Sequence, residues 1–299
     1  MKKIYLMSPD KVPLNPVLFP TILPTFQKNG FVINKQIFFS DIVMLDLHTR
    51  ISDYKEIDVE WLLQNKVPVV IFDEYDRGGL SNEIYPEPLT LQQKKIFQHI
   101  EENNIPVIHF CRLLDKTQKY SLLHYPYEKP ILYEEPPVSA EELFSRPYDV
   151  CLIANTSPQR EAIAAALRSD KRLKCIIKLG EPKLPFDEFL ALHKKGKFFI
   201  SSAAGGYTDE RVQCLFSIAA IIRQRTDQWV ANDFTHLENC LRIDSPPTEQ
   251  DLNDLYEICN NKEKLYQIYL DGVTFVKQYW SAEAMGKRYL EILTKEGIL

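Results

Sequence analysis

Residues 197–224 have the sequence KFFISSAAGGYTDERVQCLFSIAAIIRQ, and this stretch decides the fold. It begins with a short apolar run at 198–201 that is typical of a strand, followed by a loop of small residues. Apolar residues at helical spacing come next, and a second apolar run follows at 220–223. The predicted order is strand, loop, helix and strand, which is the repeating unit of an α/β sheet.

The loop in this stretch predicts an anion-binding site. A helix that opens at Asp209, with Thr208 as its cap, would direct several backbone N–H groups outward from the loop. Arg211 stands in the first helical turn, where the helix dipole disfavours a cation, so a negative ligand opposite it is indicated. The alternative is a plain connection that carries a solvated arginine.

Composition fits a two-domain protein of the cytoplasm. With 299 residues, of which 45% are hydrophobic, the chain can form two cores, and its net charge of -5 argues against a nucleic-acid partner. Six cysteines lack metal-ligand spacing and indicate reduced core residues. No leader peptide and no apolar run of about 18 residues is present, so we expect no integral membrane segment, and peripheral membrane contact is left open.

Apolar runs alternate with helical segments in both halves of the chain, which predicts two doubly wound parallel sheets. Five prolines between residues 9 and 24 are expected to exclude any long regular element before Phe26. The expected strands are 4–7, 41–47, 67–72, 105–110, 150–154, 174–178, 198–201, 220–223 and 241–243. The expected helices are 57–64, 91–103, 159–169, 186–193, 249–260, 262–279 and 282–293.

A segment rich in proline and glutamate at 129–147 predicts the connection between the domains. We therefore expect a first domain at 1–138, a second at 139–280 and a closing helix at 281–299. Each domain would be Rossmann-like.

Acidic residues follow a predicted strand of the first half. In the sequence FDEYDRGG, Asp73, Glu74 and Asp76 stand at a strand end, where α/β proteins collect functional groups, and one of them could act as a general base. His109 ends the next predicted strand and is the other candidate. The alternatives are an ordinary turn and a structural histidine.

Three cations follow strands of the second half. Arg160 lies in the first turn of a helix that Ser157 or Thr156 can cap, Lys178 ends the next strand, and Arg211 begins the later helix. Arginine binds phosphate with two hydrogen bonds and lysine adds a point charge. Together they predict a clamp for a diphosphate.

Missing motifs exclude several enzyme classes. The sequence contains no GxGxxG after the first strand, no Walker loop, no GxSxG elbow and no HExxH. These absences disfavour a dehydrogenase, a P-loop kinase, a serine hydrolase and a zinc protease. No DxD motif is present either, so a metal-chelated sugar nucleotide is not expected.

Three stretches of the second half carry a resemblance to a known family. They are YDVCLIANTSPQREAIAAAL at 148–167, KFFISSAAGGYTDERVQCLFSIAA at 197–220 and LYQIYLDGVTFVKQYWSAEAMGKRYLEIL at 265–293. They resemble the nucleotide-binding domain of GT-B glycosyltransferases, most of all the divergent CgeB-like and capsule-associated transferases. The resemblance implies two Rossmann-like domains that face a cleft.

The same resemblance implies the parts of a donor site. It places the donor diphosphate at two arginines, with a small-residue loop beneath it: Arg160, Arg211, Gly205, Gly206 and Tyr207. The acid that holds the donor ribose in the family is missing from its usual place. Asp227 or Glu238 is expected to replace it.

The resemblance implies a metal-independent glycosyltransferase without a cofactor. It would move a sugar from a nucleotide diphosphate donor to a saccharide or other hydroxyl acceptor, as in polysaccharide biosynthesis. If the mechanism inverts configuration, the base would be one of the acidic side chains after the strand or the histidine named above. Two alternatives stay open: a non-catalytic binding or assembly module of the same fold, and a nucleotide-sugar epimerase.

Overall fold

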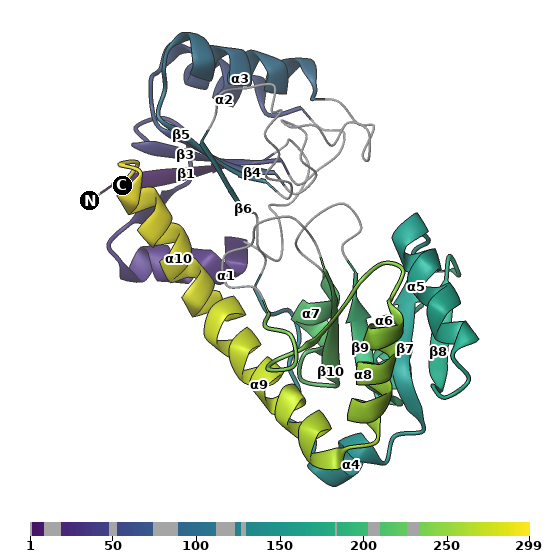
Figure 1. Cartoon of the computed structure of the whole chain (residues 1–299). Coiled ribbons are helices and arrows are strands. Elements are labelled where there is room, and N and C mark those ends of the chain that lie inside the picture. The colour runs from purple at the N-terminus through teal and green to yellow at the C-terminus, as the bar shows by residue number, and fades with distance from the viewer. Residues whose placement is uncertain are drawn as a thin grey trace. The chain divides into compact units, whose positions relative to one another are not determined.

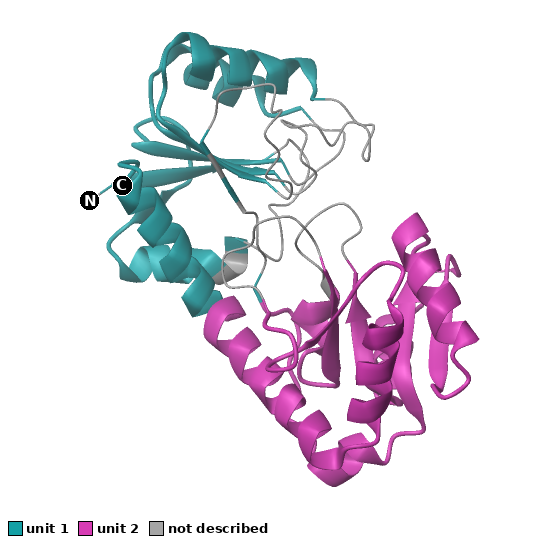
Figure 2. Cartoon of the chain, viewed as in Figure 1, with its two compact units in different colours: residues 1–130, 205–208, 282–299 teal, residues 131–204, 209–281 magenta. Residues whose placement is uncertain are grey.

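The computed structural model describes residues 2–8, 19–47, 53–73, 89–111, 123–126, 130–182, 184–202, 210–225 and 234–299. Two compact units divide the chain, coloured separately in Figure 2. The first contains the described residues up to Pro130 together with Ala282–Leu299, and the second contains the described residues from Ile131 to Ser281. Residues 131–138, which the sequence analysis assigns to the first domain, fall in the second unit. There Ile131 and Leu132 donate backbone hydrogen bonds to the carbonyls of Trp280 and Gln213.

The first unit is built on a six-stranded parallel sheet. Its strand order is β2-β1-β3-β4-β5-β6, so the chain reverses direction across the sheet between β1 and β3. The strands are β1 (Lys3–Met7), β2 (Val32–Asn34), β3 (Ile42–Asp46), β4 (Val69–Asp73), β5 (Val107–Cys111) and β6 (Leu123–Pro126). The helices are α1 (Phe19–Lys28), α2 (Glu56–Gln64), α3 (Leu91–Glu102) and α10 (Ala282–Lys295).

Helices cover both faces of this sheet, as Figure 1 shows. Side chains alternate along β3: Val43 and Leu45 join the core beneath α2 and α3, while Ile42 and Met44 join the core beneath α1 and α10. Strands buried on both faces must be apolar at nearly every position. The continuous apolar runs of the sequence therefore predicted the four inner strands of this sheet, β1, β3, β4 and β5, correctly.

Helix α1 corrects one expectation. It begins at Phe19 and continues through Pro24 to Lys28, so the prediction that prolines exclude any long regular element before Phe26 is wrong. Proline in a helix interior removes one backbone hydrogen bond. Here the helix buries Phe19, Ile22 and Phe26 completely in the core beneath it, and this burial offsets the loss.

Helix α10 brings the end of the chain onto α1. Gly286 allows the close approach, because a Cβ atom at this position would lie 2.7 Å from Cβ and Oγ1 of Thr25. Around this contact Met285, Tyr289 and Leu293 are buried. The C-terminal helix is therefore part of the hydrophobic core of the first unit.

The second unit contains a five-stranded parallel sheet in the order β11-β10-β9-β7-β8. Its chain reverses direction between β7 and β9. The strands are β7 (Tyr148–Ala154), β8 (Cys175–Leu179), β9 (Gly196–Ser201), β10 (Ala220–Gln224) and β11 (Leu241–Ile243). The helices are α4 (Ala140–Phe144), α5 (Pro158–Ser169), α6 (Phe186–His193), α7 (Glu210–Leu215), α8 (Glu249–Cys259) and α9 (Lys262–Trp280).

Both doubly wound sheets are thus confirmed. The sequence analysis missed β2 and β6, two short strands at the edges of the first sheet, and the five-residue helix α4. Among the described residues, no helix is long and apolar enough to cross a membrane, and no group of three or more His, Cys, Asp or Glu side chains is placed to hold a metal ion.

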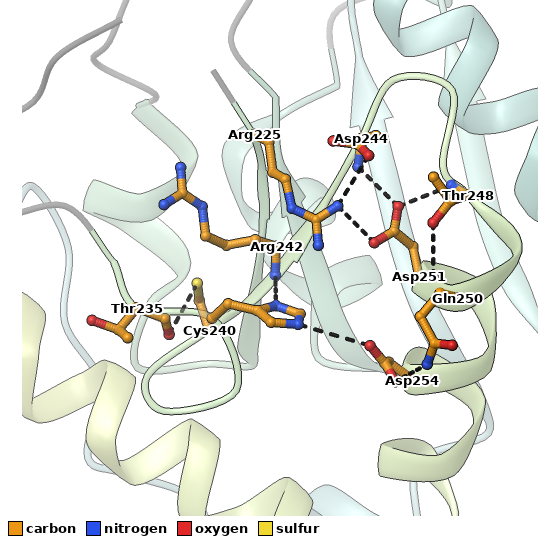
Figure 3. Close-up of polar contacts among 10 residues, drawn as sticks. Arg225, Thr235, Cys240, Arg242, Asp244, Thr248, Gln250, Asp251 and Asp254 are labelled. Atoms are coloured by element: carbon orange, nitrogen blue, oxygen red, sulfur yellow. Dashed lines mark hydrogen bonds and ion pairs between the residues drawn. The ribbon is translucent and has the colours of Figure 1, made fainter. Parts of the chain in front are cut away.

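A buried aspartate ties β10, β11 and α8 together (Figure 3). Asp251 accepts hydrogen bonds from Nη1 of Arg225 at 2.8 Å and from the backbone N–H groups of Thr248 and Asp244 at 2.9 and 3.1 Å. Burial alone would raise the pKa of Asp251, but these hydrogen bonds outweigh it and lower the pKa below its usual value. The ionised carboxylate therefore stabilises the second unit.

Substitution Gly286→Ala should destabilise the first unit by about 1–2 kcal/mol. Alanine gains roughly 1 kcal/mol of helix propensity, but a methyl group only 2.7 Å from two atoms of Thr25 costs about 2–3 kcal/mol, the upper part of the usual range for overpacking. Urea unfolding measures the difference, with the exposed neighbour Lys287→Ala as the control, expected within about 0.5 kcal/mol of wild type. A Gly286→Ala protein as stable as wild type would contradict the close packing of α1 and α10.

Substitution Asp251→Asn should lower the free energy of unfolding by about 2 kcal/mol at neutral pH, because it removes a charged acceptor from a buried network. Since the folded-state pKa is depressed, the contribution is fully present above the unfolded pKa of about 4 and is lost as pH falls through the folded value. Unfolding measured between pH 7 and pH 3 should show wild type and variant converge below about pH 4. Asp254→Asn, on the same helix, is the control, and an unchanged gap at low pH would contradict the assignment.

Candidate functional site

A pocket of about 580 Å³ opens in the second unit at the carboxyl ends of its strands. Residues from the ends of β7 and β8, the segment after β8 and the helices α6 and α7 line it. They are Ile153, Ala154, Asn155, Lys178, Glu181, Pro182, Leu184, Phe186, Phe189, Arg211 and Cys214.

Sheet topology explains why the pocket forms here. Strand β7 is where the chain reverses direction across the sheet, so the connections from β7 and β9 diverge to opposite sides. In open α/β sheets such a reversal leaves a crevice outside the carboxyl ends of the strands, and ligands bind there. The pocket therefore lies where the fold predicts a ligand.

Two of the three predicted diphosphate ligands share this pocket. Nζ of Lys178 lies 3.0 Å from Oε2 of Glu181, and this carboxylate raises the pKa of the lysine. Arg211, on the short helix α7, donates from Nε to the carbonyl of Ile153 at 3.1 Å. That bond directs the guanidinium to the end of β7, so both cations line the same cavity.

Arg160 differs from the other two cations. Its side chain is only 8% exposed and is not among the described residues that line the pocket. Nε donates to Oγ of Ser202 at 2.8 Å and Nη1 donates to the carbonyl of Asn155 at 3.1 Å. The guanidinium thus joins the end of β9 to the turn after β7, and Asn155 of that turn lines the pocket.

One wall of the pocket is aromatic, which the sequence analysis did not predict. Phe186, at the start of α6, is 48% exposed, and its ring stacks near that of Phe189 at a centroid distance of 6.4 Å. Tyr133 supports Phe186 edge-on at 5.5 Å. An exposed aromatic ring beside cationic groups suits a ligand that has both a flat ring and negative charge.

The two described candidates for a general base lie in the first unit, in its core. Nε2 of His109 and Oδ2 of Asp73 are 3.1 Å apart, and both side chains are fully buried. The imidazole also packs edge-on against Phe97 of α3, at 5.9 Å. Such burial favours a structural role for the pair, because an acceptor hydroxyl must reach the atom that takes its proton.

The remaining predicted residues divide into two groups. Glu238 is exposed in the turn that precedes β11. This turn lies where the parallel strands begin, whereas the pocket lies at their carboxyl ends, so the structure does not bring Glu238 together with the pocket. The others lie outside the described residues: Glu74, Asp76, Gly205, Gly206, Tyr207 and Asp227.

Comparison with known proteins gives the fold a name. No protein-family model and no curated protein matches the chain in sequence. An alpha-glucosyltransferase solved in complex with UDP and a 13-mer DNA is similar in structure with a TM-score of 0.57, at 10% identity over 98% of this chain and 99% of that one. The Anabaena protein HepE in complex with UDP gives a TM-score of 0.58, at 10% identity over 99% and 100% of the two chains. The chain therefore has the GT-B fold of glycosyltransferases, as its sequence indicated.

The contact between Asp73 and His109 should appear as a coupling energy of about 1–3 kcal/mol in a double-mutant cycle of Asp73→Asn and His109→Gln. Each single substitution weakens the contact between the carboxylate and the imidazole inside the core, so the double variant should lose less stability than the two losses combined. Urea unfolding of the four proteins measures the cycle. Additive losses would contradict the contact.

Proposed function

We propose that the chain is a glycosyltransferase that binds a nucleoside diphosphate sugar in the pocket of the second unit. It would transfer the sugar to a saccharide or another hydroxyl acceptor in the cytoplasm. The observation that carries the proposal is the presence of Lys178 and Arg211 in one pocket at the strand reversal of a doubly wound sheet. The GT-B fold, seen in structural neighbours that hold UDP or UDP-glucose, supports this donor class.

Transfer of the sugar leaves negative charge on the departing diphosphate. Arg211 can donate to phosphate oxygens in a fork, and Lys178 adds a compact positive charge beside it. Groups fixed in place before the reaction stabilise developing charge without reorganisation. We propose that these side chains take the role of a metal ion and that no cofactor is required.

Arg160 supports the same site indirectly. Its bonds to Ser202 and Asn155 fix the turn after β7, and that turn forms part of the pocket. On this basis we assign it to positioning the donor-binding turn.

Charge and burial restrict both the class of acceptor and the choice of base. The net charge of -5 disfavours nucleic acid as the acceptor. In an inverting mechanism the base would be Glu74 or Asp76, because Asp73 and His109 are buried against each other. In a retaining mechanism no such base is needed.

A thermal-shift panel of UDP, GDP, CMP and ADP tests the donor site. A nucleotide at a hundredfold excess over its Kd should stabilise the folded protein by about 2.7 kcal/mol. We expect one nucleotide to raise Tm selectively, and to the same extent with EDTA as with Mg²⁺. If no nucleotide raises Tm, the chain is the non-catalytic module instead; binding with donor turnover but without any acceptor would indicate the epimerase.

Substitution Arg211→Ala should weaken the binding of that nucleotide about tenfold or more, because it removes a charged donor from the diphosphate. Arg168→Ala, an exposed arginine at the end of α5, is the matched control and should bind as wild type does. Titration calorimetry measures both variants, and their Tm without ligand reports the fold. Equal affinities for Arg211→Ala and wild type would refute the placement of the diphosphate.

A further inference from the structure

A carboxylate lines the proposed diphosphate pocket, where electrostatics alone would disfavour it. Among the described lining residues, Glu181 is the acidic one, and its side chain is 48% exposed. A negative group beside Lys178 repels a phosphate and competes for the lysine. Its presence needs an explanation other than binding the diphosphate.

Backbone geometry holds Glu181 in this position. Gly180, directly after β8, has φ of +68°, a conformation that side chains with a Cβ disfavour. Its N–H donates to the carbonyl of Ala154 at 3.1 Å, and an added Cβ would lie 3.2 Å from Cγ2 of Thr156. The turn after β8 is thereby fixed against the turn after β7. Glu181, the residue after Gly180, lines the pocket.

The contact with Lys178 leaves the carboxylate able to accept more hydrogen bonds. Nζ of Lys178 donates to Oε2 of Glu181 at 3.0 Å. An ionised carboxylate offers about four lone-pair sites on its two oxygens, so further donors can be accepted. The ion pair with Lys178 also limits the rotamers of the Glu181 side chain. Hydroxyl groups of a ligand are suitable donors to such an acceptor.

The place of Glu181 in the fold indicates which hydroxyls. In doubly wound sheets that bind dinucleotides, an acidic residue about 20 residues beyond the first strand-to-helix turn binds ribose hydroxyls. Here β7 and β8 are the first and second strands of the unit, and Glu181 follows β8. We propose that Glu181, oriented by Lys178, accepts hydrogen bonds from the ribose hydroxyls of the nucleoside diphosphate; this inference rests on the proposed function.

With this assignment, each part of the nucleotide has its own binding group in the pocket. Arg211 and Lys178 meet the diphosphate, Glu181 meets the ribose, and the exposed ring of Phe186 is left for the base. Glu181 would then take the ribose-binding role for which the sequence analysis named Asp227 or Glu238. Glu238 lies at the opposite edge of the sheet and does not compete for the role.

The test compares ribose with a sugar that lacks its hydroxyls. Titration calorimetry gives Kd for UDP, ADP and GDP, each beside its 2′,3′-dideoxy form, with wild type, Glu181→Gln and Glu188→Gln. The paired nucleotides carry the same diphosphate, so the ratio of their Kd values cancels the general effect of removing a negative charge. Glu188 is an exposed residue of α6 that lies near enough to Lys178 to raise its pKa, yet it is not among the described lining residues.

We expect wild type and Glu188→Gln to favour the ribonucleotide about tenfold or more. In Glu181→Gln this preference should fall several-fold, because a neutral amide oxygen accepts hydrogen bonds more weakly than a carboxylate. A ribose preference of unchanged size in Glu181→Gln overturns the inference and leaves the proposed function intact. The inference is also overturned if Glu188→Gln loses the ribose preference to the same extent as Glu181→Gln, because a general effect of charge would then be responsible. If wild type binds none of the nucleotides, the proposed function fails and the inference with it.

Discussion

Parallel pairing of strands is the constraint on which the rest of the second unit depends. It brings the carboxyl ends of β7, β8 and β9 to one edge of the sheet, and the reversal of the chain between β7 and β9 opens a crevice there. The polar groups that line the pocket lie near the ends of these strands or after them. Lys178 lies near the end of β8 and Glu181 follows it, Arg211 follows β9, and Asn155 follows β7.

Backbone contacts turn this edge into a shaped pocket. The turns after β7 and β8 meet where Gly180 donates to Ala154 and lies against Thr156. From the other side Arg160 joins the turn after β7 to the end of β9. Polar groups that are fixed in this way are ready to meet charge when the ligand arrives, which is the condition for electrostatic stabilisation of a leaving diphosphate.

Sequence patterns predicted what local physics decides. Thr90 and Gln93 form a capping box at the start of α3, a signature that involves only residues three positions apart. The apolar runs predicted nine of the strands because buried parallel strands admit few polar residues. The directions of side chains were harder to predict from the sequence. Arg160 stands in the first turn of α5 as expected, but its guanidinium donates to Ser202, 42 residues away, a contact that sequence spacing does not indicate. Glu181 was missed because its position depends on contact between two separate turns.

The central claim is that the second unit binds a nucleoside diphosphate through its two pocket cations. A crystal structure of the protein with UDP, or with whichever nucleotide raises Tm most, tests this claim most directly. We expect phosphate oxygens within about 3 Å of Nζ of Lys178 and of the Arg211 guanidinium. A diphosphate bound elsewhere on the chain, with this pocket empty, would contradict it.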